Sequence, residues 1–253
     1  MHEIRATLTK KKQAKIILFV LDGVGGIPNP KLTELEAAKT PFLDKITKKS
    51  ETGCHIPILS GLTPGSGAAH LALFGYDPLR YDIGRGILEA LGSDVSVSEK
   101  DVLIRGNFST VKNVGSKIII DDRRAGRITT DTNKRIIKLL QSKINKIDGV
   151  GVEFTSGLEH RFVCKLKFKN KLNSSEVYIL DTDPEEVGVA PLIPKNLNQK
   201  SQKVSKIVVK LVNLIKETLK KENKANYALL RGFSIYPKIP TFEALYGLKA
   251  GSI

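Results

Sequence analysis

Residues 15–26 read KIILFVLDGVGG, and this stretch sets the expected fold class. Residues 16–21 form an unbroken apolar run with β-branched members, which predicts a strand buried on both faces. Strands of that kind belong to sheets covered by helices, so we expect an α/β fold. Asp22 follows the strand directly, where an acid at the carboxyl end of a strand can hold a cation. Asp22-Gly23 also reads as an ordinary turn, and this alternative stays open.

Helices are expected on both sides of Thr40-Pro41, where Thr40 caps and Pro41 opens the second helix. A short strand is predicted over 53–60. A helix is predicted from Gly67 onward in GAAHLALFG, and another over RGILEALG ends at Gly92.

The middle of the chain is richer in strand patterns. IRGNFSTV, KIIIDD, VGVEFTS and HRFVCKLKF alternate or are β-branched, with one amphipathic helix near TDTNKRIIKLLQSKINKI. A later helix over SQKVSKIVVKLVNLIKETLKKEN and a strand over NYALLRG follow. We therefore expect a basic leader over 1–14, an α/β core over 15–112 and 181–253, and an inserted α+β domain over 113–180. The apolar face of the later helix is predicted to hold Val204, Ile207, Val208, Leu211, Leu214 and Ile215.

The composition is that of a soluble globular protein with a strong basic charge. Lysine and arginine number 41 against 26 acidic residues, a net charge of +15. The lysines are spread along the chain and aromatic residues make up only 6%, so solvated lysine faces are favoured over a dedicated nucleic-acid site. Cys54 and Cys164 form neither a metal spacing nor a disulfide framework. The apolar run at 15–21 is too short to span a membrane, and the expected location is cytoplasmic.

Residues 62–78, LTPGSGAAHLALFGYDP, place Ser66 between two glycines at the start of a predicted helix. Flanking glycines permit a tight bend, and a helix N-terminus favours an anion, so Ser66 is a candidate nucleophile. GSG alone suits an ordinary loop equally well, and the surroundings do not match the G-x-S-x-G pattern of serine hydrolases. His70 lies about one helical turn further on, but a satisfied core histidine is the alternative and no third triad member is indicated.

Arginines in loops or at strand edges suit fixed, bidentate recognition of phosphate or carboxylate. Such arginines stand beside Gly, Asp or His in IGRGIL, IRGNF, DDRRAGR and EHRF, whereas lysine predominates in the helices. Structural salt bridges to Asp121, Asp122 and Glu159 are the alternative for some of them. The group comprises Arg85, Arg105, Arg123, Arg124, Arg127 and Arg161.

A series of motifs resembles the archaeal-type cofactor-independent phosphoglycerate mutases from about residue 15 to the end. It consists of FVLDGVGG, ELEAAKTPFLDKI, TPGSGAAHLALFGYDP, GRGILEALG, IRGNFSTV, DDRRAGRI, EHRFV, LDTDPEEVG and LLRGFSIYPKIPTFEALYGLKA. The resemblance implies an incomplete alkaline-phosphatase-like α/β core with an inserted smaller α+β domain. It also implies the glycolytic isomerisation of 3-phosphoglycerate and 2-phosphoglycerate through a phosphoserine, with two divalent metal ions (Mn, Mg, Zn or Co).

Carried over residue by residue, the resemblance makes Ser66 the catalytic nucleophile and Asp22 and Ser66 metal ligands. Metal coordination, rather than His70, is then expected to activate the serine. The arginines expected to hold the substrate, a small phosphorylated carboxylate, are Arg85, Arg123, Arg124, Arg127 and Arg161.

Two departures from the family pattern bear on activity. Gly67 stands where the family usually has an acid directly after the serine. The family's remaining metal ligands are His and Asp residues in the last third of a longer chain, whereas after His160 this sequence has no histidine and only two aspartates, Asp181 and Asp183, in a turn-forming TDP context.

We therefore expect a C-terminally truncated mutase that is inactive alone, with a complementing C-terminal polypeptide or a homo-oligomer as a further partner. The alternatives are another phosphoryl-transfer enzyme or phosphatase of the superfamily, or a non-enzymatic basic remnant that binds an acidic partner or nucleic acid.

Overall fold

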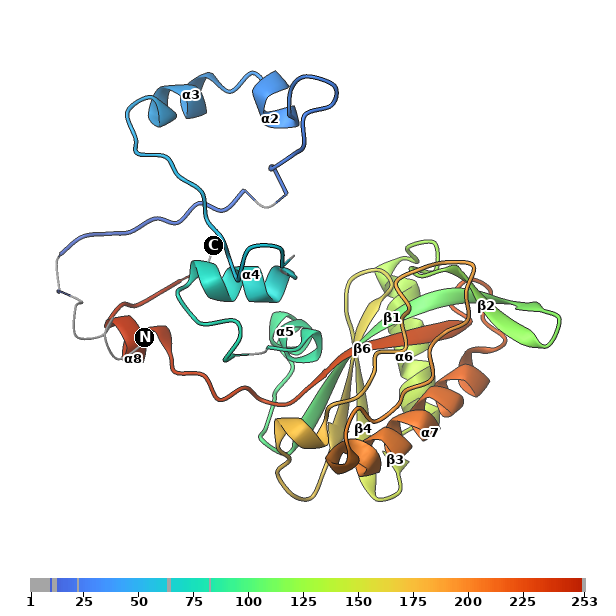
Figure 1. Ribbon diagram of the computed structural model, residues 1–253. Helices are drawn as coiled ribbons and strands as arrows, with labels where there is room; N and C mark the ends of the chain where they lie inside the picture. Colours follow the sequence, from blue (N-terminus) through green and yellow to red (C-terminus); the bar gives the residue numbers. More distant parts are fainter. Residues whose placement is uncertain (1–9, 11–12, 22, 63–64, 82, 252–253) are drawn as a thin grey trace. The chain divides into compact units, whose positions relative to one another are not determined.

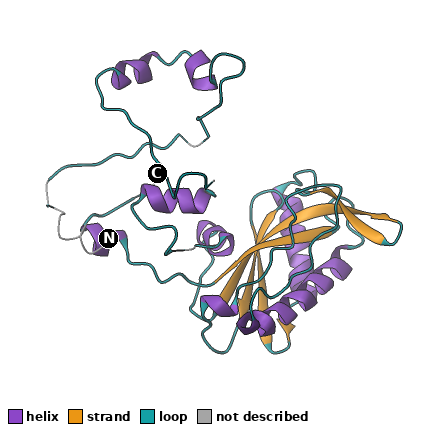
Figure 2. Cartoon of the chain, in the orientation of Figure 1, coloured by secondary structure: helices purple, strands orange, loops and turns teal. Residues whose placement is uncertain are grey.

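The computed structural model describes residues 10, 13–21, 23–62, 65–81 and 83–251. The chain divides into two compact units, a smaller one formed by Met1–Leu62 with Pro240–Ile253 and a larger one formed by Thr63–Ile239. Their helices and strands are shown in Figures 1 and 2.

The larger unit is built on an antiparallel sheet whose longest strand is β1 (Asp101–Val114) (Figure 1). Along one edge β1 pairs with β5 (Arg161–Lys167). Along its other edge it pairs first with β6 (Tyr227–Ser234) and then with β2 (Lys117–Asp122). Beyond β5 the sheet continues with β4 and β3, whose bounds are Val150–Ser156 and Lys146–Ile147.

One face of this sheet is covered by α6 (Thr130–Lys143) and α7 (Gln202–Leu219) (Figure 1). Their buried side chains form a single hydrophobic core with alternate residues of β1, as the period of two along a strand requires. The predicted apolar face of α7 is buried except at Leu214, which is exposed. The β1 residues that enter this core are Val102, Ile104 and Phe108.

The other face of β1 packs against α5 (Arg85–Gly92), where Ile87 is fully buried against Leu103 and Val163. Gly86 makes this close packing possible, because a Cβ at this position would lie 2.2 Å from the carbonyl oxygen of Leu103. The N-terminus of α5 is thereby fixed to the centre of the sheet.

Shorter elements complete the larger unit. α4 (Ser66–Leu73) begins at the serine, as the glycine-flanked sequence predicts. Two 3-10 helices, η1 (Ser174–Glu176) and η2 (Gln199–Ser201), precede α7 in the sequence. None of the described helices is both long enough and apolar enough to cross a membrane.

In the smaller unit, α2 (Glu34–Ala37) begins with a capping box in which Thr33 and Glu36 each bond the other's backbone N–H. α3 (Pro41–Thr47) opens at its proline, as predicted. α8 (Phe242–Tyr246) follows near the C-terminus.

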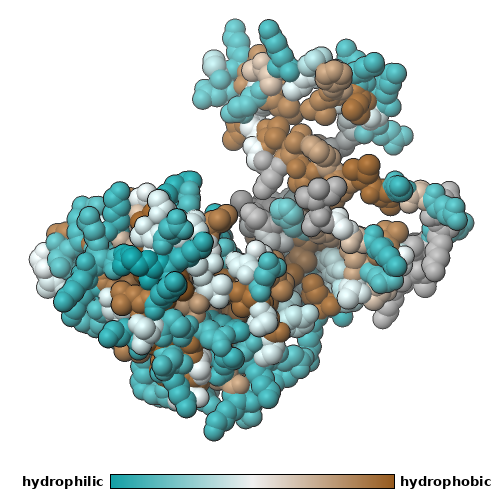
Figure 3. All heavy atoms as spheres, turned by 180° about the vertical axis from the view of Figure 1, so that it is seen from behind, coloured by the Kyte–Doolittle hydropathy of each residue, from teal (hydrophilic) through white to brown (hydrophobic). Residues whose placement is uncertain are grey.

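The prediction of a buried strand at 16–21 is wrong for this structure. These residues form no strand, and their side chains are exposed, Ile17 at 88%. Hydrophobic residues are exposed on the surface of the smaller unit (Figure 3). Within its described residues this unit contains no strand and no buried side chain, so the run has no sheet to join. The strand predicted over 53–60 is absent for the same reason.

The predicted domain boundaries cut across the sheet. The boundary between 112 and 113 falls inside β1, and β5, expected in the insert, pairs with residues 101–107 of β1, expected in the core. The larger unit is also wider than the expected insert over 113–180. The division into a leader, a core and an insert therefore stays a prediction.

Candidate functional site

Seven arginines converge on one pocket of about 230 Å³ in the larger unit. They include every arginine selected from the sequence as a substrate-binding candidate, together with two others. The residues that line this pocket, the arginine pocket, are Arg85, Arg105, Asn107, Arg123, Arg124, Arg127, Glu159, His160, Arg161 and Arg231.

Three of the arginines lie on a tight turn, 123–127, that follows β2. The carboxylate of Asp122 accepts hydrogen bonds from the backbone N–H of Arg124 at 2.7 Å and of Gly126 at 2.6 Å. Residues 125–127 all have positive φ values, of 50°, 59° and 49°. Left-handed backbone at non-glycine residues is sterically costly and gathers at functional sites, where the surrounding structure enforces it.

Salt bridges to Asp121, Asp122 and Glu159 explain little of how these arginines are placed. Arg127 pairs with Glu159 at 3.7 Å, and both side chains are largely exposed. Asp121 pairs instead with Lys112 at 2.6 Å, and the carboxylate of Asp122 binds the backbone of the turn.

Two carboxylates hold three of the seven guanidinium groups in place. The fully buried Asp183 carboxylate accepts hydrogen bonds from Nε and Nη2 of Arg123 at 2.9 and 2.8 Å, and from Nη1 of Arg231 at 3.1 Å. The bonds to Asp183 raise the pKa of Arg123, whereas burial lowers the pKa of Arg231. Glu185 pairs with Arg231 and, at 3.9 Å, with Arg85.

Arg124 and Arg161 differ from these, because neither side chain has an ion pair or hydrogen bond within the described part of the chain. Burial, followed by the charges of Arg161 and Arg124, lowers the pKa of His160 from 6.5 to about 4. His160 is therefore neutral at pH 7. The arginine pocket has a positive potential that an anion would neutralise.

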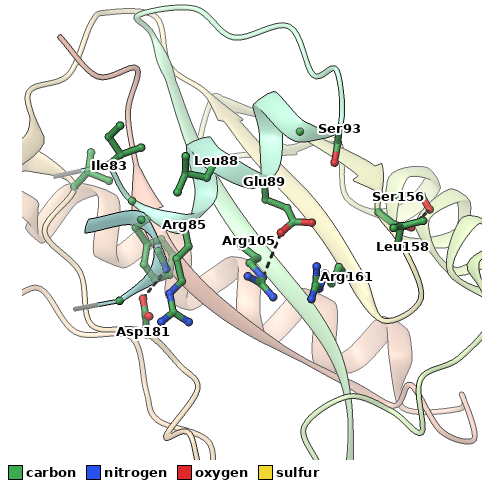
Figure 4. A pocket seen from close by; sticks show the side chains of 18 of the residues that line it. Ile83, Arg85, Leu88, Glu89, Ser93, Arg105, Ser156, Leu158, Arg161 and Asp181 are labelled. Atoms are coloured by element: carbon green, nitrogen blue, oxygen red, sulfur yellow. Dashed lines mark hydrogen bonds and ion pairs between the residues drawn. The ribbon is translucent and has the colours of Figure 1, made fainter. Parts of the chain in front are cut away.

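A larger groove, of about 1020 Å³, shares Arg85, Arg105 and Arg161 with the arginine pocket. Figure 4 shows Arg161 beside the ion pair of Arg105 with Glu89, whose closest atoms are 3.5 Å apart. The two glycines that flank Ser66 also line this groove. The start of α4 and the arginine pocket thus border the same open space.

A sequence model of the family described as 2,3-bisphosphoglycerate-independent phosphoglycerate mutase matches residues 47–225, which include every arginine of the pocket except Arg231. The chain belongs to this family. The probable 2,3-bisphosphoglycerate-independent phosphoglycerate mutase of Aquifex aeolicus is 52% identical over 248 residues, covering 98% of this chain and 61% of the relative. That of Thermotoga maritima is 47% identical over 252 residues, covering 100% and 61%. The chain thus spans about 61% of the length of these curated relatives.

Solved structures agree with this assignment at the level of the fold. The cofactor-independent phosphoglycerate mutase of Thermoplasma acidophilum matches with a TM-score of 0.54 at 24% identity, over 70% of this chain and 48% of that one. The PH0037 protein of Pyrococcus horikoshii matches with a TM-score of 0.51 at 25% identity, over 74% and 42%. The expected fold class, an alkaline-phosphatase-like α/β fold, is confirmed.

The residues expected to carry the mutase chemistry are only partly placed. Ser66 is the first residue of α4, after Gly65 as N-cap, but its side chain lies outside what the structure describes. Asp22 lies outside the described residues altogether. A Cβ on Gly67 would come 3.3 Å from Cδ1 of Leu88, so an acid at this position requires a small shift of that leucine.

The described residues do not fit a two-metal site. Among them, no group of three or more His, Cys, Asp or Glu side chains could hold a metal ion. Oδ1 of Asp181 accepts the backbone N–H of Gly232 at 2.8 Å, and burial raises its pKa. Asp183 is committed to two arginines. Neither aspartate is available to a metal without giving up these partners.

Sequence reasoning did not select Asn107, Glu159, His160 or Arg231 for this pocket, and it grouped Arg105 with the loop arginines without carrying it over as a substrate-binding candidate. One signal was available for Arg105 and Arg231. Each is followed by glycine, and the only other Arg-Gly dipeptide in the sequence is Arg85-Gly86. All three Arg-Gly pairs thus place their arginine in the same pocket, two of them where a glycine allows close packing of α5 against the sheet.

Proposed function

We propose that the arginine pocket binds phosphoglycerate, and that the chain takes part in the interconversion of 3-phosphoglycerate and 2-phosphoglycerate. The convergence of the predicted arginines in one pocket supports this most strongly. Phosphate and carboxylate groups both match the planar donor pairs of guanidinium, and a phosphoglycerate carries one of each.

The arginines divide into two groups with different expected roles. Arg123 and Arg231 are neutralised and oriented by Asp183, so they shape the pocket. Arg124 and Arg161 can accept an anion without breaking an existing side-chain pair within the described residues. We expect these two to contribute most of the binding free energy, because the ligand does not have to displace a carboxylate that is already paired with them.

Ser66 is the proposed acceptor of the phosphoryl group. Its oxygen forms a bond to phosphorus while the bond from phosphorus to the glycerate 3-oxygen breaks, and that oxygen leaves with a proton. The bound glycerate then takes the phosphoryl group back on its 2-oxygen, and Ser66 regains its proton. Holding the glycerate between these two transfers is the task of the arginine pocket.

The metal requirement belongs to the proposal as well. Two divalent ions, Mn, Mg, Zn or Co, would neutralise charge on the phosphoryl oxygens and lower the pKa of the serine hydroxyl. Asp22 and Ser66 are the proposed ligands from this chain.

Binding can be tested by calorimetric titration of the 253-residue chain with 3-phosphoglycerate. We expect saturable binding that weakens roughly tenfold or more in Arg124→Ala and in Arg161→Ala, about 1.4 kcal/mol or more for each. Arg135→Ala is the matched control, because Arg135, on α6, pairs with Glu222 and does not line the pocket. Absence of saturable binding, or equal loss in Arg135→Ala, would contradict the proposal.

Turnover separates the alternatives. We expect the chain alone to be inactive towards 3-phosphoglycerate with added Mn²⁺, so clear formation of 2-phosphoglycerate would overturn that expectation. Release of free phosphate would favour a phosphatase of the same superfamily. Steeply salt-dependent binding to DNA or RNA would favour a basic remnant.

The proposed partners are phosphoglycerate and either a complementing C-terminal polypeptide or a second copy of the chain. The proposed location is cytoplasmic, where glycolysis takes place.

A further inference from the structure

The first turn of α6 is joined by buried hydrogen bonds to the turn that connects β4 and β5. Asn133 is fully buried, and its Nδ2 donates to the carbonyl oxygens of Glu159 at 2.7 Å and of Arg161 at 2.6 Å. The backbone N–H of Glu159 donates to Oγ1 of Thr130 at 3.2 Å. Three hydrogen bonds therefore fix the backbone of 158–161 to the start of α6.

This turn needs external support. Glu159 has a φ of 51°, a left-handed conformation that costs a non-glycine residue about 1 kcal/mol. Within the turn, the N–H of Gly157 donates to the carbonyl oxygen of Arg161 at 2.9 Å, and the N–H of Arg161 donates to that of Leu158 at 3.0 Å. The bonds from Asn133 add a second donor to the Arg161 carbonyl and hold the strained residue in place.

The same helical turn is also connected to the other arginine-bearing loop. α6 begins at Thr130, and its N-cap, Thr129, comes only two residues after the turn 123–127 ends. Arg127 on one loop pairs with Glu159 on the other at 3.7 Å, and both side chains are largely exposed. Exposed ion pairs of this kind contribute little to stability. The relative position of the two loops therefore depends mainly on the start of α6.

We propose that Asn133 is a positioning residue of the arginine pocket, which sets Arg161 and His160 against Arg124 by holding the backbone of 158–161 to α6. The inference rests on the proposed function of this pocket as an anion site and extends it to a residue outside the pocket lining. Asn133 touches no ligand in this proposal. Its effect is to keep the guanidinium groups of Arg124 and Arg161 at a separation that suits one anion.

Gln141 offers a matched control on the same helix. Its Nε2 donates to the carbonyl oxygen of Val152 at 3.0 Å, and its Oε1 accepts the N–H of Phe154 at 2.8 Å. Gln141 thus holds the middle of β4 in the way that Asn133 holds the turn. It lies about two helical turns after Asn133 and does not line the pocket. Gln141→Ala removes equivalent bonds without releasing the arginines.

The first measurement is the affinity of the 253-residue chain for 3-phosphoglycerate. Asn133→Leu keeps the approximate size of the side chain and removes both donors without adding a charge, and we expect roughly tenfold weaker binding or more, while Gln141→Ala leaves the affinity unchanged. Equal affinities of Asn133→Leu and the parent chain, with both proteins folded, would overturn the proposal.

A second measurement does not depend on a ligand. The charged groups that act on His160 are Arg161, Arg124, Glu159 and Arg105. When the turn is released, NMR titration should show the pKa of His160 rising from about 4 towards 6.5, because the ring becomes less buried and Arg161 and Arg124 move away. A rise in Asn133→Leu, which adds no charge, but not in Gln141→Ala supports positioning even if the parent chain does not bind 3-phosphoglycerate. An unchanged titration in a folded variant would contradict it.

A milder variant covers the case in which Asn133→Leu does not fold. Thr130→Val removes only the bond from the Glu159 N–H to Oγ1 of Thr130 and leaves the shape of the side chain intact. It should shift both the affinity and the His160 titration in the same direction by a smaller amount. No shift in either measurement would count against the proposal.

Discussion

At the scale of single residues, two arginines of the pocket depend on Asp183. Asp183→Asn keeps the shape of the side chain but leaves Arg123 and Arg231 without their buried counter-charge. We expect the free energy of unfolding to fall by about 3–5 kcal/mol, measured by urea denaturation. The control is Asp148→Asn, which removes an exposed pair with Lys210 and should cost less than about 1 kcal/mol. Equal losses in the two variants would show that Asp183 has no special role.

His160 gives the stability of the folded chain a predicted pH dependence. Its pKa is about 4 in the folded chain and near 6.5 when unfolded, so the unfolded state binds more protons between these values. The contribution of His160 to stability is complete above pH 6.5 and is lost as the pH falls towards 4. In urea denaturation at pH 7 and pH 4.5, His160→Gln should lose less stability between the two conditions than the parent chain. Identical losses would contradict the depressed pKa.

How far the site could be predicted also depends on single residues. Six arginines were selected because arginine in loops beside Gly, Asp or His is characteristic of anion recognition, and the family resemblance made five of them substrate-binding candidates. Arg231 was not selected because, in NYALLRG, it lies within a predicted strand. Only the register of β6 on β1 places Arg231 opposite Arg105, and local sequence does not specify that register.

At the scale of elements, the position of α5 depends on its glycines. A Cβ on Gly86 would lie 2.2 Å from the carbonyl oxygen of Leu103 and 2.6 Å from that of Gly232, both of them backbone atoms. Gly86→Ala should therefore push α5 off the sheet and cost about 2 kcal/mol or more, seen as a lower thermal midpoint. Gly92→Ala, in the same helix with nothing within 4 Å, should be neutral or slightly stabilising. A neutral Gly86→Ala would refute this account of the packing.

Elements were predictable where their own sequence supplies the pattern and the chain supplies the partners. β1, β2, β4 and β5 alternate or are β-branched, as strands are, and α6 and α7 supply the apolar faces that cover them. The run at 16–21 has an equally clear pattern but failed, because a strand needs neighbours and the described part of its unit has none. The sequence pattern predicts which secondary structure a segment favours, and pairing with a neighbouring strand decides whether a strand forms.

At the scale of the whole molecule, the two units differ in how far they bury their apolar side chains. The larger unit has a continuous core, whereas no described residue of the smaller unit is buried. The six apolar residues at 16–21 stay in water, with Phe19 81% exposed. Such runs are characteristic of surfaces that another chain or segment covers. Either of the partners proposed above, a complementing polypeptide or a second copy, would cover it.

Hydrogen exchange can distinguish these partners. In the dilute 253-residue chain, we expect the backbone amides of 16–21 to exchange at the earliest labelling time, while those of 104–108 in β1 are protected up to the global free energy of unfolding. Protection of 16–21 that grows with chain concentration would identify a second copy as the partner. Protection that appears only when the unmatched part of the Aquifex aeolicus relative is added as a separate polypeptide would identify a complementing chain. Protection in the dilute chain alone would contradict the exposed run, because it would require strand pairing within this polypeptide.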